Sequence, residues 1–246
     1  PPSPLRRVRI QEKTKIGEYL EKDDGAGAVG LAQMGVLEIH TWNSDEAHLE
    51  EPNRLVMDLD PGDGVGWPDV VTAARTVRRA LGALGLKSFV KTTGGRGLHV
   101  VAPLAPSADW SDCLAFTRAL AEAIARSDPE HYTTTFAKAG RARLILIDYL
   151  RNNRTNTSIA AYSTRAKPHA PISVPIAWRE LTASLDPASF TVATVPGRLA
   201  RVRKDPWDGY WTSRQKLTRS QLRAVGVADD RAGTTRARSG RGRHHG

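Results

Sequence analysis

Apolar residues recur along the chain both in short runs and in longer stretches with helical spacing. The short runs are bounded by glycine, proline or charged residues and predict strands. The clearest are RRVRI (6–10), RLVMDLD (54–60), KSFVKT (87–92), LHVVAPL (98–104) and ARLILIDYL (142–150). The glycine-rich join between the third and fourth runs favours a hairpin.

Two longer stretches predict amphipathic helices. Residues 67–86 place their apolar side chains on one stripe, and Gly85 suits the end of that helix. The stripe consists of Val70, Val71, Ala74, Val77, Leu81 and Leu84. Residues 110–127 repeat the pattern and contain the single cysteine, Cys113, which we expect to fill the core. The core order is β-α-β-β-α-β, which predicts an α+β fold with a ferredoxin-like or RNA-recognition-like sheet and additional strands.

Other segments predict elements around this unit. Residues 28–35 predict a short helix, and residues 36–40 and 158–163 predict strands. A short helix is expected around IAWRELTASL (176–185) in an otherwise irregular region. A basic helix is expected to close the fold within residues 203–226.

Charge adds a class of partner to this picture. The 246 residues are 40% hydrophobic, enough for a sizeable core, and carry a formal net charge of +10, which favours polyanions such as nucleic acid. Residues 229–246 contain five arginines, two aspartates and almost nothing apolar. We therefore expect a catalytic domain at 1–228 and a disordered basic tail at 229–246.

The prediction of cellular location depends on two features that the sequence does not show, a membrane span and a secretory signal. No apolar stretch is long enough to span a membrane, which needs about eighteen residues. The N-terminal PPSPLRRVRI has no apolar centre of a secretory signal. We expect a cytoplasmic, nucleoid-associated protein without a membrane partner.

Three aspartates interrupt otherwise apolar strands. Asp58 and Asp60 are two residues apart in one strand, so their side chains project from the same face, and Asp148 lies in another strand. Buried carboxylates are costly unless something positive meets them. Together the three can hold one or two Mg²⁺ or Mn²⁺ ions for phosphoryl transfer, provided that Asp148 lies near the other two. Salt bridges or turn caps are the alternative.

The segment KTTGGRGLHV (91–100) is a candidate phosphate-binding loop. Its glycines, which include Gly94 and Gly95, let the backbone approach an anion, while Thr93, Arg96 and His99 can donate to phosphate oxygens. An ordinary hairpin turn is the alternative. Several arginines around Asp148 suit a polyphosphate substrate or, alternatively, surface salt bridges: Arg141, Arg143, Arg151, Arg154 and Arg165.

These stretches together resemble a known family, the polymerase domain of bacterial ligase D. The similarity covers about residues 5–215 and is carried, in order, by LAQMGVLEIHTW, LVMDLDPGDG, KTTGGRGLHVVAPL, LIDYLRNNRTNTSIAAYSTRA, ISVPIAWREL and DPWDGYW. That family belongs to the archaeo-eukaryotic primase superfamily and acts in non-homologous end joining. The resemblance implies a primase-type catalytic fold.

The resemblance also implies an activity and a set of site residues. The activity is template-directed transfer of nucleotides, with ribonucleotides preferred, from nucleoside triphosphates to the 3′ end of a DNA primer. Asp58, Asp60 and Asp148 match catalytic aspartates that hold two Mn²⁺ or Mg²⁺ ions. Thr93, Arg96 and His99 match triphosphate contacts beside Gly94 and Gly95. Arg141 and Arg165 match arginines near the nucleotide, and His40 matches a histidine near its sugar.

Departures from the family leave other functions open. The family usually has Ser and Lys where Thr93 and Arg96 stand, and it carries further residues, including 5′-phosphate-binding lysines, before VRI. The domain is therefore expected to be short at its N-terminus. A metal-dependent phosphodiesterase or nuclease, a non-catalytic nucleic-acid-binding paralogue and de novo priming are the alternatives. Broken DNA ends, Ku and an ATP-dependent DNA ligase are the expected partners.

Overall fold

The computed structural model describes residues 5–12, 14–22 and 25–228 and has a six-stranded sheet at its centre. The strand order is β10-β5-β6-β4-β8-β7, and every pair is antiparallel except β7–β8. The strands are β4 (Arg54–Pro61), β5 (Phe89–Thr92), β6 (Leu98–Pro103), β7 (Tyr132–Thr133), β8 (Ile145–Asp148) and β10 (Pro175–Ile176). The predicted β-α-β-β-α-β unit is confirmed, with β10 and β7 as additional edge strands.

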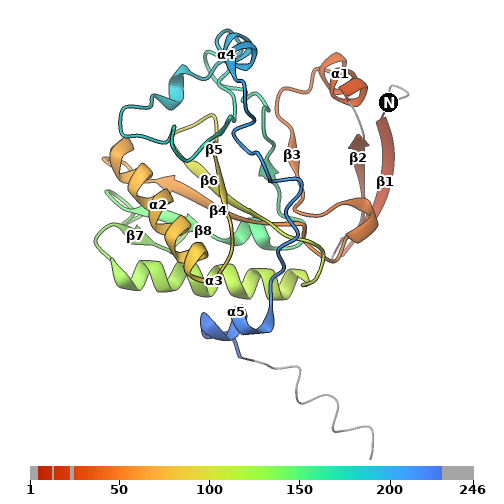
Figure 1. Ribbon diagram of the computed structural model, residues 1–246. Helices are drawn as coiled ribbons and strands as arrows, with labels where there is room; N and C mark the ends of the chain where they lie inside the picture. The colour runs from red at the N-terminus through yellow and green to blue at the C-terminus, as the bar shows by residue number, and fades with distance from the viewer. Residues whose placement is uncertain (1–4, 13, 23–24, 229–246) are drawn as a thin grey trace, which may run out of the picture.

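Two helices cover one face of this sheet (Figure 1). Helix α2 (Trp67–Ala83) begins after Gly66 and is followed by Gly85, whose φ of +75° allows the chain to leave the helix. Helix α3 (Trp110–Ser127) is capped by Asp109, which accepts from the N–H of Asp112. Both apolar stripes pack on the sheet in one large core. The two predicted helices are therefore confirmed.

Alternation along the strands decides what faces the helices and what faces away. In β4, Leu55, Met57 and Leu59 belong to the helix-side core, whereas Val56 packs on the opposite face with Trp207. Asp58 and Asp60 therefore project from the face that α2 and α3 leave open. The functional side chains are positioned by this alternation.

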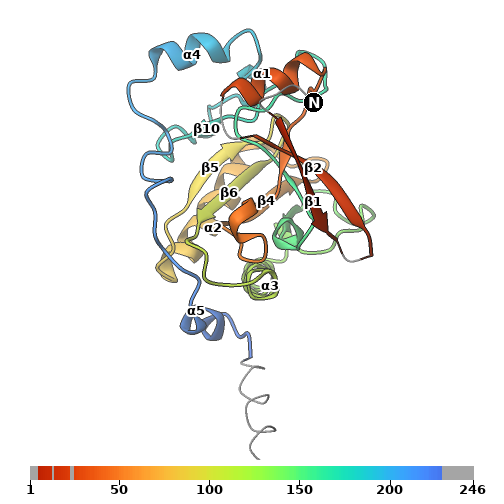
Figure 2. The same ribbon diagram turned by 90° about the vertical axis from the view of Figure 1, so that its right-hand side faces the viewer.

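Smaller elements surround the central sheet (Figure 2). The hairpin of β1 (Leu5–Gln11) and β2 (Ile16–Lys22) stands beside the sheet, and β3 (His40–Thr41) pairs with β9 (Ser158–Ile159). The short helices are α1 (Gly25–Gln33), α4 (Val195–Arg201) and α5 (Arg219–Ala224), and the 3₁₀ turns are η1 (Glu46–His48), η2 (Leu150–Asn152) and η3 (Pro187–Ser189). The first strand, the first helix and the closing basic helix match their predictions.

Three local predictions are wrong. Residues 36–39 form no strand, because side-chain and loop bonds satisfy the backbone: the N–H of Ile39 donates to Ser163 Oγ. The strand predicted at 158–163 is limited to β9. The helix expected around 176–185 is a series of turns, in which the carboxylate of Glu180 accepts the N–H of Ala177 and ties the chain to Arg198 in α4.

Other predictions concern single residues and the chain as a whole. Cys113 is fully buried in α3, and burial raises the pKa of its thiol, so the prediction of a core residue is confirmed. The predicted tail at 229–246 lies outside the described residues. None of the described helices combines the length and apolar character needed for a bilayer span.

Candidate active site

Four polar residues form one row across the open face of the sheet. Lys91 on β5 is paired with His99 on β6, His99 with Asp58 on β4, and Asp58 with Asp148 on β8. All four are buried, which is unusual for charged side chains unless they have partners. The row carries positive charge at one end and negative charge at the other.

The three predicted aspartates converge at the negative end of this row. Single oxygens of Asp58, Asp60 and Asp148 all lie within 4.8 Å of one another, a spacing that a divalent cation can bridge. Asp58 and Asp148 are buried, whereas Asp60 is exposed toward the cavity. The structure thus gives the sequence-based metal hypothesis the geometry that it requires.

Positive and neutral groups surround the Asp58 carboxylate. Arg151 Nε lies 3.0 Å from its Oδ2, and His99 Nε2 lies 3.3 Å from the same oxygen. Burial opposes ionisation, but these contacts hold the pKa of Asp58 below its usual range. The other oxygen, Oδ1, is buried without a hydrogen-bond partner among the described residues. A carboxylate oxygen of this kind suits a cation as its missing partner.

The two other carboxyls and the histidine are shifted differently. Asp60 is open to the cavity, but the surrounding protein still desolvates its carboxyl; this desolvation, followed by the charges of Asp58 and Asp148, raises the pKa of Asp60 to about 6. Burial and Asp58 likewise raise the pKa of Asp148. Burial, assisted by the ammonium of Lys91, lowers the pKa of His99 to about 4, so the imidazole is neutral at pH 7. The cluster therefore carries concentrated negative charge that a metal ion would neutralise.

The glycine-rich loop between β5 and β6 is held in one conformation. Thr93 Oγ1 donates to the carbonyl of Gly97 at 3.2 Å. Gly94 has a φ of +67°, and a Cβ there would lie 2.6 Å from Arg165 Cγ. A Cβ on Gly97 would lie 2.3 Å from the carbonyl oxygen of Leu59. The glycines therefore serve close packing against Arg165 and β4 as well as exposing the loop backbone.

A carboxylate joins the two predicted nucleotide contacts on the far side of this loop. Glu38 Oε2 lies 2.9 Å from His40 Nε2 and 3.1 Å from Arg165 Nε, while Oε1 accepts the N–H of Ala166 at 2.8 Å. The contact with His40, followed by Ala166 and Arg165, lowers the pKa of Glu38 to about 2. Arg165 also donates to the carbonyl of Thr93 at 2.8 Å. Glu38 thus fixes His40 and Arg165 relative to the glycine loop.

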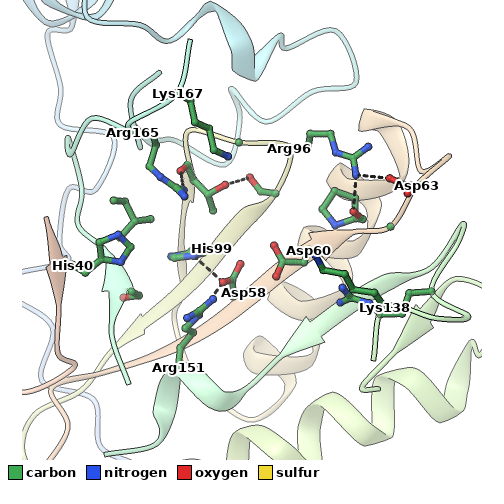
Figure 3. Close-up of a pocket in the computed structure, with 18 of the residues that line it drawn as sticks. His40, Asp58, Asp60, Asp63, Arg96, His99, Lys138, Arg151, Arg165 and Lys167 are labelled. Atoms are coloured by element: carbon green, nitrogen blue, oxygen red, sulfur yellow. Dashed lines mark hydrogen bonds and ion pairs between the residues drawn. The ribbon is translucent and has the colours of Figure 1, made fainter. Parts of the chain in front are cut away.

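Many of these groups line one cavity of about 700 Å³, among them His40, Asp58, Asp60, His99 and Arg165 (Figure 3). Asp58 and Asp60 point into it from β4, with cationic side chains around them. Its cations are Arg96, Lys138, Arg141, Arg151, Arg165 and Lys167, against Asp58, Asp60 and Asp63. Arg96 is held by the carbonyl of Pro61 at 3.1 Å and by Asp63 at 3.4 Å. A carboxylate cluster inside a cationic cavity suits a metal-bound polyanion.

The comparisons with known proteins identify the family. The family model described as the LigD primase-polymerase domain matches residues 1–207. The chain belongs to this family. The predicted family is thereby confirmed, and membership places the chain among nucleotidyltransferases of the primase-polymerase type.

Relatives of this LigD-type domain are longer proteins. The multifunctional non-homologous end joining protein LigD of Pseudomonas aeruginosa is 37% identical over 199 residues, which cover 80% of this chain and 24% of that protein. The bifunctional non-homologous end joining protein LigD of Bacillus subtilis is 30% identical over 185 residues, which cover 75% of this chain and 30% of that protein. The chain thus spans about a quarter to a third of the length of the curated relatives it matches.

A solved structure supports the same assignment. The polymerase domain from Mycobacterium tuberculosis ligase D in complex with DNA is similar to this chain, with a TM-score of 0.79 and 29% sequence identity. The match covers 87% of this chain and 76% of that chain. The predicted primase-type α+β fold is confirmed by this likeness.

Most predicted site residues of this LigD-type domain line the cavity, and Asp148 and Gly94 adjoin residues that do. Arg143 and Arg154 do not: Arg143 lines a separate small cavity and Arg154 pairs with Glu50.

The sequence-based prediction missed several other residues. The sequence predicts Arg151 only as one of several arginines suited to a polyphosphate, whereas its guanidinium contacts two of the three aspartates, Asp58 and Asp148. Lys138 and Lys167 line the cavity without having been singled out. Lys91 begins the candidate phosphate-binding segment but has no predicted role, although it is a lone cation in an apolar strand; burial lowers its pKa to about 7.

Proposed function

We propose that this chain adds nucleotides to the 3′ end of a DNA primer under the direction of a template strand. One observation carries the proposal: three aspartates converge, two of them lining a cationic cavity, in a member of the LigD polymerase family. The primer 3′-oxygen forms a bond to the α-phosphorus of a nucleoside triphosphate, and the bond from that phosphorus to the pyrophosphate oxygen breaks. Positioning and charge neutralisation are the main contributions of the protein.

The Asp58, Asp60 and Asp148 side chains are proposed to hold one or two Mn²⁺ or Mg²⁺ ions. Their all-oxygen donor set and the unpartnered Oδ1 of Asp58 support this role. Such ions, when bound, neutralise phosphate charge and make the primer hydroxyl a better nucleophile. His99 lies on the side of Asp58 away from Asp148, and its imidazole orients the Asp58 carboxylate.

The nucleotide is proposed to lie along the glycine loop. Thr93, Gly95, Arg96 and His99 border the space for the triphosphate, Gly94 belongs to the same loop, and the cations Arg141 and Arg165 line the same cavity. His40 lies at the end of the cavity beyond Arg165, where it can meet the sugar. A preference for ribonucleotides is part of this proposal and depends on that sugar contact.

The biological setting is proposed from the relatives. Their names place them in non-homologous end joining, and the structural neighbour is a polymerase domain in complex with DNA. We infer that this chain binds primer–template or broken DNA ends and fills them before ligation. Ku and an ATP-dependent DNA ligase are the proposed protein partners. The division into a catalytic domain at 1–228 and a basic tail at 229–246 belongs to the same proposal.

A labelled primer–template duplex with Mn²⁺ and nucleoside triphosphates tests this function. We expect the primer to lengthen and the added nucleotide to follow the template base in four duplexes that differ at that base. Products shorter than the primer would instead indicate a metal-dependent nuclease. DNA binding without any change in primer length, unaffected by Asp148→Asn, would indicate a binding module.

A further inference from the structure

A second cavity of about 540 Å³ adjoins the candidate active site. Its floor is the open face of the sheet, formed by Val56, Lys91 and Val101 on three neighbouring strands. One wall comes from β9 and the residues after it, and the other from residues 199–211. His99, Ser158 and Ile159 line both cavities, so the two spaces are neighbours along one surface.

Exposed apolar side chains frame this second cavity. Trp211 is 76% exposed, Leu199 is 47% exposed and Tyr162 is 43% exposed, and all three line it. Trp211 is held by an edge contact with Tyr210, which stacks on the buried Trp207. Tryptophan and tyrosine side chains exposed on a rigid support are suited to stacking against a planar ring.

Two exposed cations belong to the segment that forms one wall of the cavity. Arg201 and Arg203 are exposed and form no ion pair with the described residues, whereas the neighbouring Arg198 and Lys204 are paired with Glu180 and Asp208. Arg203 lines the cavity itself, as do Arg54 and Lys91, against a single acid, Asp205. Aromatic rings combined with free arginines match the two parts of a nucleotide, its base and its phosphate.

We propose that the second cavity binds an unpaired stretch of the DNA strand, with a base stacked on Trp211 or Tyr162 and the adjoining phosphate at Arg203. The inference rests on the proposed function, because it takes the substrate to be a nucleic acid. The shared border at His99 places this site next to the proposed catalytic centre. An unpaired strand that runs on from the primer–template junction can therefore reach it without leaving the open face of the sheet.

Binding of single-stranded DNA without nucleotides tests the site. The probe is a fluorescein-labelled oligothymidylate, and its anisotropy is measured with wild type, Trp211→Ala, Trp211→Phe and Arg203→Ala. We expect Trp211→Ala to weaken binding about tenfold, and Trp211→Phe, which keeps a stacking ring, to retain most of the affinity. Arg203→Ala should weaken binding and reduce the salt dependence by about one released counterion.

Tryptophan fluorescence and a charge-matched control make the result specific. Trp211 is far more exposed than the buried Trp42, Trp110 and Trp207, and the half-buried Trp67 and Trp178 do not line the second cavity. DNA should therefore quench tryptophan emission in wild type and not in Trp211→Phe. Arg126→Ala removes an exposed arginine from α3, on the other face of the sheet, and should bind like wild type.

Equal affinity of wild type, Trp211→Ala and Arg203→Ala, with unchanged quenching in Trp211→Phe, would overturn the inference. That result leaves the proposed function standing if the wild-type chain still extends a primer. Failure of the wild type to extend any primer, by contrast, counts against the proposed function.

Discussion

Asp58 and Asp148 face each other directly across the β4–β8 pair, so two carboxylates occupy one rung of the sheet. Like charges at directly opposed positions destabilise a sheet unless a counter-charge is present. Arg151, three residues after Asp148, supplies it: its Nε lies 3.0 Å from Asp58 and 3.5 Å from Asp148. The guanidinium thus balances the charge that the proposed metal ion would also neutralise.

Replacing Arg151 by methionine should destabilise the protein when divalent metal is absent. The guanidinium is partly exposed, so we expect a loss of about 2 kcal/mol in the free energy of unfolding, less than for a fully buried pair. Mn²⁺ should restore more stability to Arg151→Met than to wild type, because the ion replaces the missing charge. Urea unfolding in EDTA and in Mn²⁺ measures both effects.

The control for this prediction is the surface pair of Arg118 and Glu122 on α3. Arg118→Met should leave the free energy of unfolding and its response to Mn²⁺ unchanged. An Arg151→Met protein with wild-type stability in EDTA would show that Arg151 does not offset the repulsion between the aspartates.

Asp60 should make stability depend on pH in the metal-free protein. Its pKa is raised from 3.8 to about 6, so the folded state holds this proton more tightly than the unfolded state does. The ionised carboxylate is therefore destabilising above pH 6, and the penalty disappears as the pH falls from 6 to below 4. Asp60→Asn should stabilise the metal-free protein by about 1 kcal/mol at pH 7.5, a value reduced for solvent exposure.

Unfolding curves in EDTA for wild type and Asp60→Asn between pH 4 and pH 8 measure this difference. The gain from the substitution should shrink as the pH is lowered and vanish near pH 4. A gain that stays constant across this range would mean that the proton on Asp60 is not responsible. Mn²⁺ affinity of the wild type should also fall below pH 6, because the ion competes with the proton.

Asn152 should be a major source of stability at the site. Its side chain accepts the N–H of Val56 at 2.8 Å and donates to the carbonyls of Val56 and Tyr149 at 2.7 and 2.9 Å. Strand β8 pairs with β4 only from Asp58 to Pro61. The side-chain amide of Asn152 takes the place of a partner strand at Val56, whose N–H and carbonyl it bonds. Asn152→Ala leaves buried backbone groups unsatisfied and should cost about 3 kcal/mol in urea unfolding.

Asn156→Ala provides the comparison, because that side chain makes one hydrogen bond within the described part of the chain, to the carbonyl of Leu150. It should cost about 1 kcal/mol. Equal losses for the two variants would contradict the role assigned to Asn152.

Glu38 should act as a positioning residue for the nucleotide. Glu38→Gln keeps the shape but loses the charge that holds His40 and Arg165, so we expect the KM for nucleotide to rise about tenfold. The kcat should change much less, since Glu38 is not among the groups proposed to contact the reacting atoms. Steady-state primer extension separates the two constants.

Glu50→Gln breaks an ion pair with Arg154 that does not line the candidate active site, and it is the matched control. Its KM should equal that of wild type. If Glu38→Gln also has a wild-type KM, the contacts of Glu38 do not position the nucleotide.

The central sheet and the shared face of Asp58 and Asp60 were predictable because both follow from local patterns, whereas the approach of Asp148 was expected only from the family resemblance. The period-two placement of Asp58 and Asp60 decides that they share a face, and the glycines before His99 mark the hairpin. The same pattern wrongly predicted a strand at residues 36–39. There the N–H of Ile39 donates to the side chain of Ser163, which is distant in sequence, and not to a neighbouring strand. Local periodicity does not carry that information.

Contacts between distant segments account for the rest. Arg151 reaches Asp58 because the 3₁₀ turn after Asp148 brings it back over β4, and Glu38 meets Arg165 across more than a hundred residues of chain. The second cavity exists because the segment around Trp211 passes over the open face of the sheet. Three of its aromatic residues could be seen in DPWDGYW, but their place around a cavity that His99 also lines could not.

The most direct test of the proposed catalytic centre is the rate of primer extension by Asp148→Asn relative to wild type, with Mn²⁺ and a templated nucleotide. Circular dichroism and a melting curve establish first that the variant is folded. The proposal predicts template-directed lengthening by the wild type and a rate lower by more than about 100-fold for the variant. Extension by folded Asp148→Asn at the wild-type rate would contradict it.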